Sequence, residues 1–147
     1  MTIHDQKYHS DFGVIQSSLQ LLNEEKTEKL ISLTYAIFFE ACPAAESLWE
    51  KDDPESRSKM FNGVILMVID KLMRPEIFNV NLDTDIKDHH GYGVKKEMYA
   101  MFFHSLMAAL REVLSDDFTE EMLQAWEKQL EQISGIVKIH IDSTPKV

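Results

Sequence analysis

The chain has 147 residues, 44% of them hydrophobic, and a formal net charge of −10 at neutral pH. This length is typical of one domain, and the apolar fraction is large enough to build a core. The acidic balance argues against nucleic acid or an anionic membrane surface as a partner, because both are negatively charged. The single cysteine, Cys42, rules out an internal disulfide and fits a reducing compartment.

Neither a secretory signal nor a membrane span is visible in the sequence. The N-terminal stretch MTIHDQKYHSDFG has no apolar segment of the kind that a signal peptide needs. No run of about 18 apolar residues occurs, so no helix is expected to cross a bilayer. We therefore expect one cytoplasmic domain over residues 1–147, with flexible termini at residues 1–10 and 142–147.

Apolar residues recur at three- and four-residue steps through the first part of the chain, which is the spacing of one helix face. The first helix is expected from Phe12 to Leu22. Thr27 is expected to cap the second helix, because a threonine hydroxyl can accept from the free amides of a first turn. Pro43 fits the first turn of a short third helix.

The middle of the chain begins with a clear helix start. Asp53 serves as the N-cap and Pro54 takes the first helical position, and the helix carries apolar residues as far as Leu72. The following sequence, MRPEIFNVNLDTD, is the least regular part of the chain. Only a short helical piece is expected there, from about Leu82 to the glycines at positions 91 and 93.

Two long helices complete the chain. One is expected over Lys95–Leu114, where SDD breaks it, and Thr119 caps the other, whose apolar face runs to Val137. No strand is supported. The pattern predicts an all-α domain of about seven or eight helices, several of them too short for a simple four-helix bundle.

Several kinds of chemistry have no motif in the sequence. There is no glycine-rich phosphate loop, no His-Glu-x-x-His and no Cys-x-x-Cys. The carboxylate clusters lie at helix starts, where they complement the helix dipole. Cys42 has no basic neighbour that would activate it as a nucleophile. We therefore predict no catalytic residue.

The sequence KDHHGYGV at residues 87–94 holds two adjacent histidines before a glycine-rich corner. A histidine in the last turn of a helix is most often a cation that satisfies the terminal carbonyls. Read outward from His89, however, the segment is His-x-Gly-Tyr-Gly-Val, and Tyr99 lies ten residues further on.

This segment resembles the proximal segment of bacterial single-domain globins and of the globin domain of flavohaemoglobins. Three more stretches resemble other parts of the same family, in the same order: TYAIFFEACPAAESLW the second and third helices, SRSKMFNGVILMVID the distal helix, and FTEEMLQAWEKQL the opening of the final helix. The resemblance runs from about Phe12 to Val137. It implies a globin fold around one haem b, which binds O2, NO or CO reversibly.

The resemblance also assigns roles to individual residues. His89 would be the proximal iron ligand, a normal role for a neutral imidazole. Tyr35, eight residues before Pro43, would direct its hydroxyl at the gas. The other cofactor-binding positions are Trp49, in place of a phenylalanine that stacks on the haem, Ser56 and Met60 on the distal side, and Val94 and Tyr99 on the proximal side.

The sequence departs from the family at several of these positions. Ser56 replaces a distal glutamine or histidine and is too short to reach a bound gas, which leaves Lys59 or Met60 as alternative sixth ligands. Flavohaemoglobins carry a glutamate late in the final helix. Ile141 occupies the matching position here, and Asp142 is only its neighbour.

His90 is the alternative proximal ligand. Family members usually have an apolar residue four positions before the ligand, which Ile86 provides for His90, whereas Asp85 precedes His89. The downstream spacing to Val94 favours His89, because the short Gly-Tyr-Gly corner allows little variation in the number of residues between the ligand and Val94.

These observations lead to a functional expectation. The chain ends at Val147 without a flavin or NAD domain, so NO dioxygenase activity would need a separate reductase. We expect oxygen handling or NO detoxification with an external reductase, in a monomer or homodimer. One alternative is a gas- or redox-sensing module that acts through a partner. The other is a haem-free interaction domain, which is suggested by the departures from the family at Ser56 and Trp49.

Overall fold

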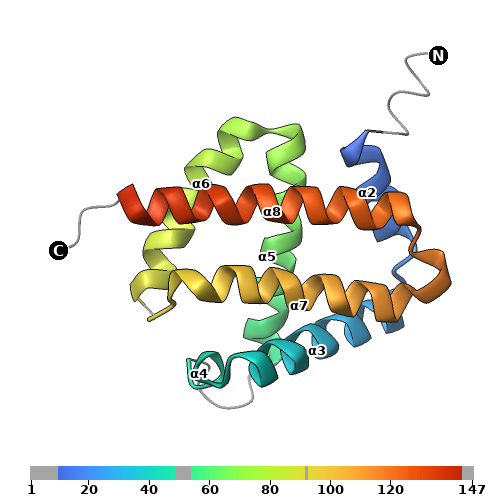
Figure 1. The fold of residues 1–147 in the computed structure, drawn as a ribbon, viewed down its shortest axis with the longest axis horizontal. Coiled ribbons are helices and arrows are strands. Elements are labelled where there is room, and N and C mark those ends of the chain that lie inside the picture. Colours follow the sequence, from blue (N-terminus) through green and yellow to red (C-terminus); the bar gives the residue numbers. More distant parts are fainter. Residues whose placement is uncertain (1–9, 49–53, 92, 144–147) are drawn as a thin grey trace.

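The fold is all α-helical in a computed structural model that describes residues 10–48, 54–91 and 93–143. Those residues form seven α-helices and one 3-10 turn, and contain no strand (Figure 1). The elements in chain order are α2 (Asp11–Gln20), α3 (Glu24–Ala41), α4 (Pro43–Glu46), α5 (Pro54–Met73), α6 (Pro75–Gly91), α7 (Lys96–Leu114), the 3-10 turn η1 (Ser115–Asp117) and α8 (Glu120–Ser143). The predicted fold class is confirmed.

The start of α3 differs from the sequence prediction. Asn23 is the N-cap, and its side-chain oxygen accepts a hydrogen bond from the Lys26 amide at 2.8 Å. Thr27 lies inside the first turns of the helix, so the prediction that it caps this helix is wrong. Asparagine is among the best N-cap residues, and Asn23 is placed to receive the first free amides. Asp53, the predicted cap of α5, lies outside the described residues.

The region predicted to be irregular is one continuous helix, α6. Pro75 opens it two residues after α5 ends, in the first turn where proline loses no hydrogen bond. Phe78, Leu82 and Ile86 are spaced four apart, and all three are buried. The residues between them, Asn-Val-Asn and Asp-Thr-Asp, are mostly polar, so the apolar pattern is weak in the sequence. Packing of this one stripe stabilises the helix.

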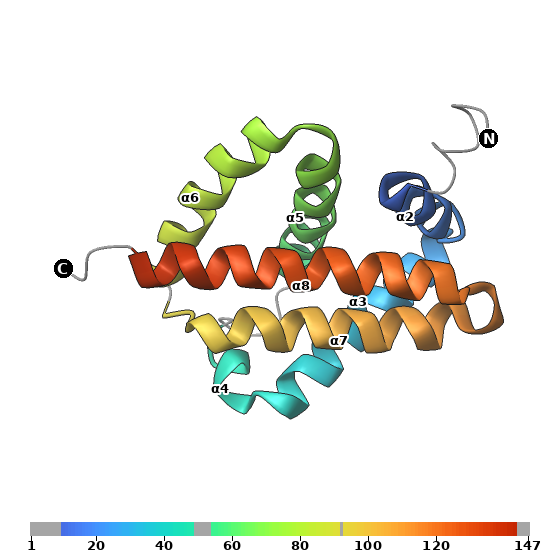
Figure 2. The ribbon, with the colours of Figure 1, turned by 45° about the horizontal axis from the view of Figure 1, so that its top comes forward.

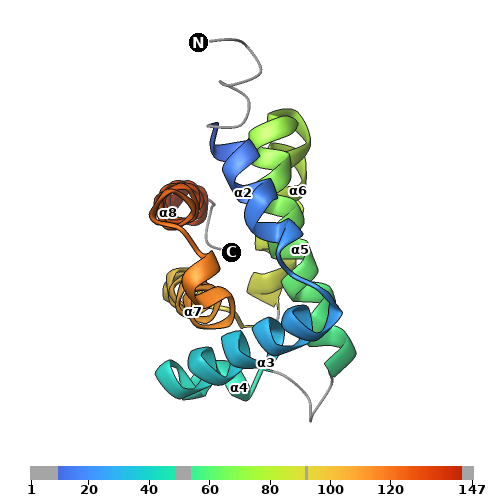
Figure 3. The ribbon, with the colours of Figure 1, turned by 90° about the vertical axis from the view of Figure 1, so that its right-hand side faces the viewer.

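The helices form two layers. Helices α7 and α8 lie side by side and run antiparallel, as Figure 1 shows. In Figure 3 they make one layer, α2, α5 and α6 make the other, and α3 crosses one end of both. Figure 2 shows α5 and α6 joined at a corner at the top of the view and spreading apart toward α8. No helix among the described residues is long and apolar enough to cross a bilayer.

Helix α8 is attached to α2 through a buried polar contact. The Trp126 indole N–H donates to the Ser18 hydroxyl at 2.8 Å, and that hydroxyl donates to the Ile15 carbonyl at 2.6 Å. Trp126 and Ser18 are both fully buried. Because a buried indole N–H needs a partner, this pair favours one position of α8 on α2. Thr119 caps α8 as predicted, accepting from the Met122 amide at 3.1 Å.

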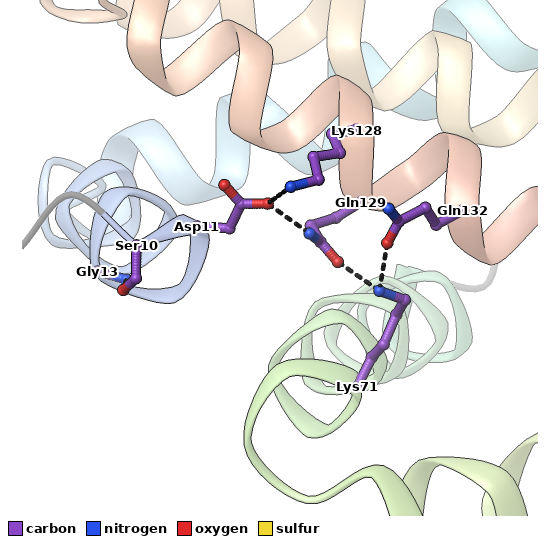
Figure 4. Close-up of polar contacts among 7 residues, drawn as sticks. All are labelled: Ser10, Asp11, Gly13, Lys71, Lys128, Gln129 and Gln132. Carbon is purple, nitrogen blue, oxygen red and sulfur yellow. Dashed lines mark hydrogen bonds and ion pairs between the residues drawn. The ribbon is translucent and has the colours of Figure 1, made fainter. Parts of the chain in front are cut away.

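A second polar network joins α8 to α2 and α5 (Figure 4). The Lys71 ammonium donates to the side-chain oxygens of Gln129 and Gln132 at 2.6 and 2.7 Å. The Gln129 amide donates to the Asp11 carboxylate at 2.6 Å, and Lys128 pairs with the same carboxylate at 3.2 Å. Burial lowers the pKa of Lys71, the Asp11 charge raises it, and the Lys128 charge lowers it further. Gln129 therefore bridges a lysine and a carboxylate on two other helices.

Replacing this bridge should destabilise the protein. Gln129 is buried, and Gln129→Leu leaves the Lys71 ammonium and the Asp11 carboxylate each short of a partner. We expect the free energy of unfolding to fall by about 1–3 kcal/mol, measured by urea denaturation. Gln124→Leu is the matched control, because Gln124 is exposed on the same helix. Equal losses in the two variants would show that the network contributes nothing specific.

Candidate functional site

His89 lies in the last turn of α6 with one ring nitrogen already engaged. Its Nδ1 is 2.6 Å from the Asp85 main-chain oxygen, one turn earlier. A carbonyl oxygen can only accept, so Nδ1 carries a proton, and in the neutral ring the lone pair lies on Nε2. This hydrogen bond also fixes the orientation of the ring. His89 is therefore a half-buried imidazole whose second nitrogen is suited to binding a metal.

A tight corner connects His89 to α7. The Val94 amide donates to the His89 carbonyl and the Gly93 amide to the His90 carbonyl, both at 3.0 Å. Gly93 has φ = 88°, a backbone conformation that residues with a side chain rarely adopt. Any other residue would be strained at this position, and the corner fixes the start of α7 beside the end of α6.

Tyr99 packs beside His89 from the first turns of α7. The two ring centroids are 5.9 Å apart, with the planes at 50°. Burial raises the pKa of Tyr99 to about 12, and the charge of Asp85 adds to the effect. The Tyr99 hydroxyl is consequently neutral at physiological pH and remains a donor. Val94, at the corner, is half-buried and packs against the core.

The two adjacent histidines have different surroundings. His90 is exposed, whereas His89 is half-buried against Tyr99. Ile86, four residues before His90, is part of the hydrophobic core. In the sequence analysis, Ile86 was an argument for His90 as the ligand. Its burial in the core gives a separate reason for an apolar residue at this position.

Tyr35 lies on α3 and is almost completely buried, with 1% of its surface exposed. Its hydroxyl donates to the Arg57 main-chain oxygen in α5 at 2.9 Å. Its ring centroid lies 5.7 Å from that of Phe39 and 5.5 Å from that of Phe102. Burial raises the pKa of Tyr35 well above its usual value, although the Arg57 charge opposes this shift. Tyr35 is therefore a neutral donor at physiological pH.

Arg57 is the contact of Tyr35 that sequence reasoning missed. Its guanidinium carbon lies 6.0 Å from the centroid of the Tyr35 ring, within the range of a cation–π interaction. The hydrogen bond uses its carbonyl, which every residue has, so residue type could not have revealed it. The one available signal was that Arg57 is the only arginine within α5.

The remaining predicted distal residues lie on α5 near Arg57. Ser56 and Met60 are half-buried and one helical turn apart. The Lys59 side chain is 78% exposed, and its ammonium lies 3.8 Å from the Glu55 carboxylate. Trp49 lies outside the described residues.

The end of α8 reaches both α6 and α7. The His140 Nε2 lies 2.9 Å from the Asp83 carboxylate on α6, a contact that the sequence analysis did not anticipate. Hydrogen bonds from Lys87 and His140 lower the pKa of Asp83. Asp142 pairs with Lys96 of α7 at 3.2 Å. Ile141, at the position of the family's late glutamate, is half-buried and packs against the core.

Comparison with known proteins identifies the family. The Globin family model matches residues 34–137. A globin-like protein of Aquifex aeolicus is 32% identical over 117 residues, which cover 78% of this chain and 80% of that one. A flavohemoprotein of Xylella fastidiosa is 24% identical over 127 residues, which are 85% of this chain but 32% of the relative. The chain thus spans about a third of that longer protein.

Solved structures have the same fold. A bacterial globin from Campylobacter jejuni superposes with a TM-score of 0.72 at 23% identity, covering 90% of this chain and 95% of that one. The engineered carbene transferase RmaNOD from Rhodothermus marinus superposes with a TM-score of 0.70 at 22% identity, covering 88% and 89%. The predicted resemblance is confirmed, and the family match over residues 34–137 shows that this chain belongs to the globin family.

Proposed function

We propose that this globin binds one haem b through His89 and reversibly binds a diatomic gas, O2, NO or CO, on the side of Tyr35. The observation that supports this most directly is the 2.6 Å contact between His89 Nδ1 and the Asp85 carbonyl. It places a proton on Nδ1, so in the neutral ring the lone pair lies on Nε2, the nitrogen that would bind iron.

The surrounding residues fit a haem better than a bare metal ion. Among the described residues, no three His, Cys, Asp or Glu side chains lie together as a metal site. Haem needs only one or two ligands from the protein, because the macrocycle supplies the others. Met60, Val94 and Tyr99 are only partly buried although they pack against the core, so their uncovered surfaces suit a flat apolar cofactor. Trp49 is proposed as a further contact.

The bound haem would supply the iron at which the gas binds, and the chain would control both sides of it. His89 would bind the iron, with its ring oriented by the Asp85 carbonyl and packed beside the neutral Tyr99. On the other side, Tyr35 offers a neutral buried hydroxyl. In a dry pocket one such hydrogen bond contributes about 1–2 kcal/mol, or about tenfold in affinity. Ser56 is too short to replace it.

Two residues on α5 are proposed as alternative sixth ligands. Met60 is half-buried, whereas the Lys59 side chain is 78% exposed and pairs with Glu55. Ligation by Lys59 would require that pair to open and the ammonium to lose its proton. Met60 is therefore the stronger candidate of the two.

In the cell we propose oxygen handling or NO detoxification in the cytoplasm, with electrons from a separate reductase. The family supports gas binding, and the match to one third of a flavohemoprotein supports a reductase partner.

The first prediction concerns the proximal ligand. Adding haem to the purified protein should produce a Soret band. His89→Ala should abolish stoichiometric binding, because it removes the imidazole that the Asp85 carbonyl orients. His90→Ala is the matched control, since it removes an adjacent exposed imidazole, and it should bind haem normally. The reverse result would make His90 the ligand. A wild-type protein without a Soret band would leave a haem-free role.

The second prediction concerns the distal hydroxyl. Tyr35→Phe keeps the buried ring and removes only the donor, so oxygen should dissociate from the ferrous protein about tenfold faster. Stopped-flow measurement of oxygen release tests this. Carbon monoxide release is the internal control, because CO is a weak hydrogen-bond acceptor and should respond little. An unchanged oxygen rate would remove Tyr35 from the distal role.

The third prediction concerns Tyr99 and pH. Its pKa is about 12 in the folded protein, against an ordinary value of 10.0 for a tyrosine in water, so the folded state retains a proton that the unfolded state loses. Stability should therefore fall as pH rises from about 10 to about 12. Tyr99→Phe should weaken this dependence in urea titrations of the haem-free protein. Identical pH profiles for the two proteins would show that Tyr99 is not buried as described.

A further inference from the structure

The hydroxyl of Tyr35 already has an acceptor within the protein. It donates to the Arg57 carbonyl at 2.9 Å, from a ring that is 1% exposed and packed between Phe39 and Phe102. A tyrosine hydroxyl has one proton to donate. A gas that accepts this proton must therefore compete with the start of α5.

The Arg57 carbonyl can release the hydroxyl at low cost. Arg57 lies in the first turns of α5, so its oxygen also accepts the helical hydrogen bond from the Phe61 amide, four residues on. Loss of the tyrosine leaves this oxygen with its helical partner. The ring stays in place because its aromatic contacts do not involve the hydroxyl. The change requires the O–H to rotate away from that carbonyl.

The Arg57 side chain acts on the same hydroxyl through charge. Its guanidinium carbon lies 6.0 Å from the Tyr35 ring centroid. A cation near the ring stabilises negative charge on the phenol oxygen, which lowers the pKa of Tyr35 and makes its O–H a better donor. Arg57 thus contributes twice, through its main-chain oxygen and through its guanidinium.

We propose that Arg57 is a positioning residue for Tyr35. In the ligand-free protein the Tyr35 hydroxyl donates to the Arg57 carbonyl, and when a gas that accepts hydrogen bonds is present, the hydroxyl donates to the gas instead. This inference rests on the proposed function and adds a consequence. Gas binding weakens the attachment of α3 to the first turns of α5, so the occupancy of the distal site is transmitted to that end of the helix.

The test is amide hydrogen exchange at residues 57–61, followed in the haem-loaded protein with O2, with CO and without gas. Oxygen should speed exchange there about fivefold, the equivalent of one hydrogen bond, whereas CO should have little effect. Tyr35→Phe should exchange at the faster rate throughout and lose the response to oxygen. In the haem-free protein, the same variant should also exchange about fivefold faster than wild type, which tests the resting contact without any cofactor.

A side-chain variant separates the two contributions of Arg57. Arg57→Gln keeps the carbonyl, so the exchange response to oxygen should persist, while oxygen release should become about two- to fivefold faster. Arg111→Gln is the matched control, because it removes an exposed arginine from α7 and should change neither quantity. Loss of the exchange response in Arg57→Gln would overturn the assignment to the carbonyl.

The outcomes distinguish this inference from the proposed function. If Tyr35→Phe speeds oxygen release but oxygen leaves exchange at residues 57–61 unchanged, the transfer is wrong and the distal role stands. If neither oxygen release nor exchange responds, both are wrong. If haem does not bind, the proposed function fails, and equal exchange in haem-free wild type and Tyr35→Phe would also refute the resting contact.

Discussion

The packing of α3 on α7 is the constraint on which the rest of the structure depends. The Phe102 ring of α7 lies 5.3 Å from Phe38 and 5.5 Å from Tyr35, edge-on to both, and all three side chains are buried. One turn earlier, α7 also places Tyr99 against His89. A single helix thus contacts the tyrosine of one side and the histidine of the other. The relative position of the two sides follows from one aromatic cluster.

Helix α8 holds the other elements through polar contacts. Trp126 and Gln129 attach it to α2 and α5, and His140 attaches it to α6 near the end that carries His89. Among the described residues, no buried side-chain nitrogen or oxygen lacks a hydrogen-bond partner. Because such groups are satisfied in only one arrangement, they select the position of α8 rather than merely adding stability.

The two sides of the candidate site are built in different ways. His89 is oriented by a carbonyl of its own helix, four residues earlier, so this hydrogen bond is local and can form as soon as α6 forms. Tyr35 is held by a carbonyl 22 residues away on another helix. A local hydrogen bond persists through small movements between helices. A bond between helices changes with such movements, so the Tyr35–Arg57 contact is the more sensitive of the two to a shift of α3 relative to α5.

The sequence by itself determined the helical class, the glycine corner, and the ten-residue spacing that brings His89 and Tyr99 together, because these depend on periodicity and short-range geometry. It misplaced the cap of α3 and missed the continuity of α6. Only the tertiary structure decided that α6 is one helix, that Arg57 holds Tyr35, and that His140 pairs with Asp83. Each of these depends on a partner distant in the chain. Burial and main-chain acceptors supplied by such partners leave no trace in local residue order.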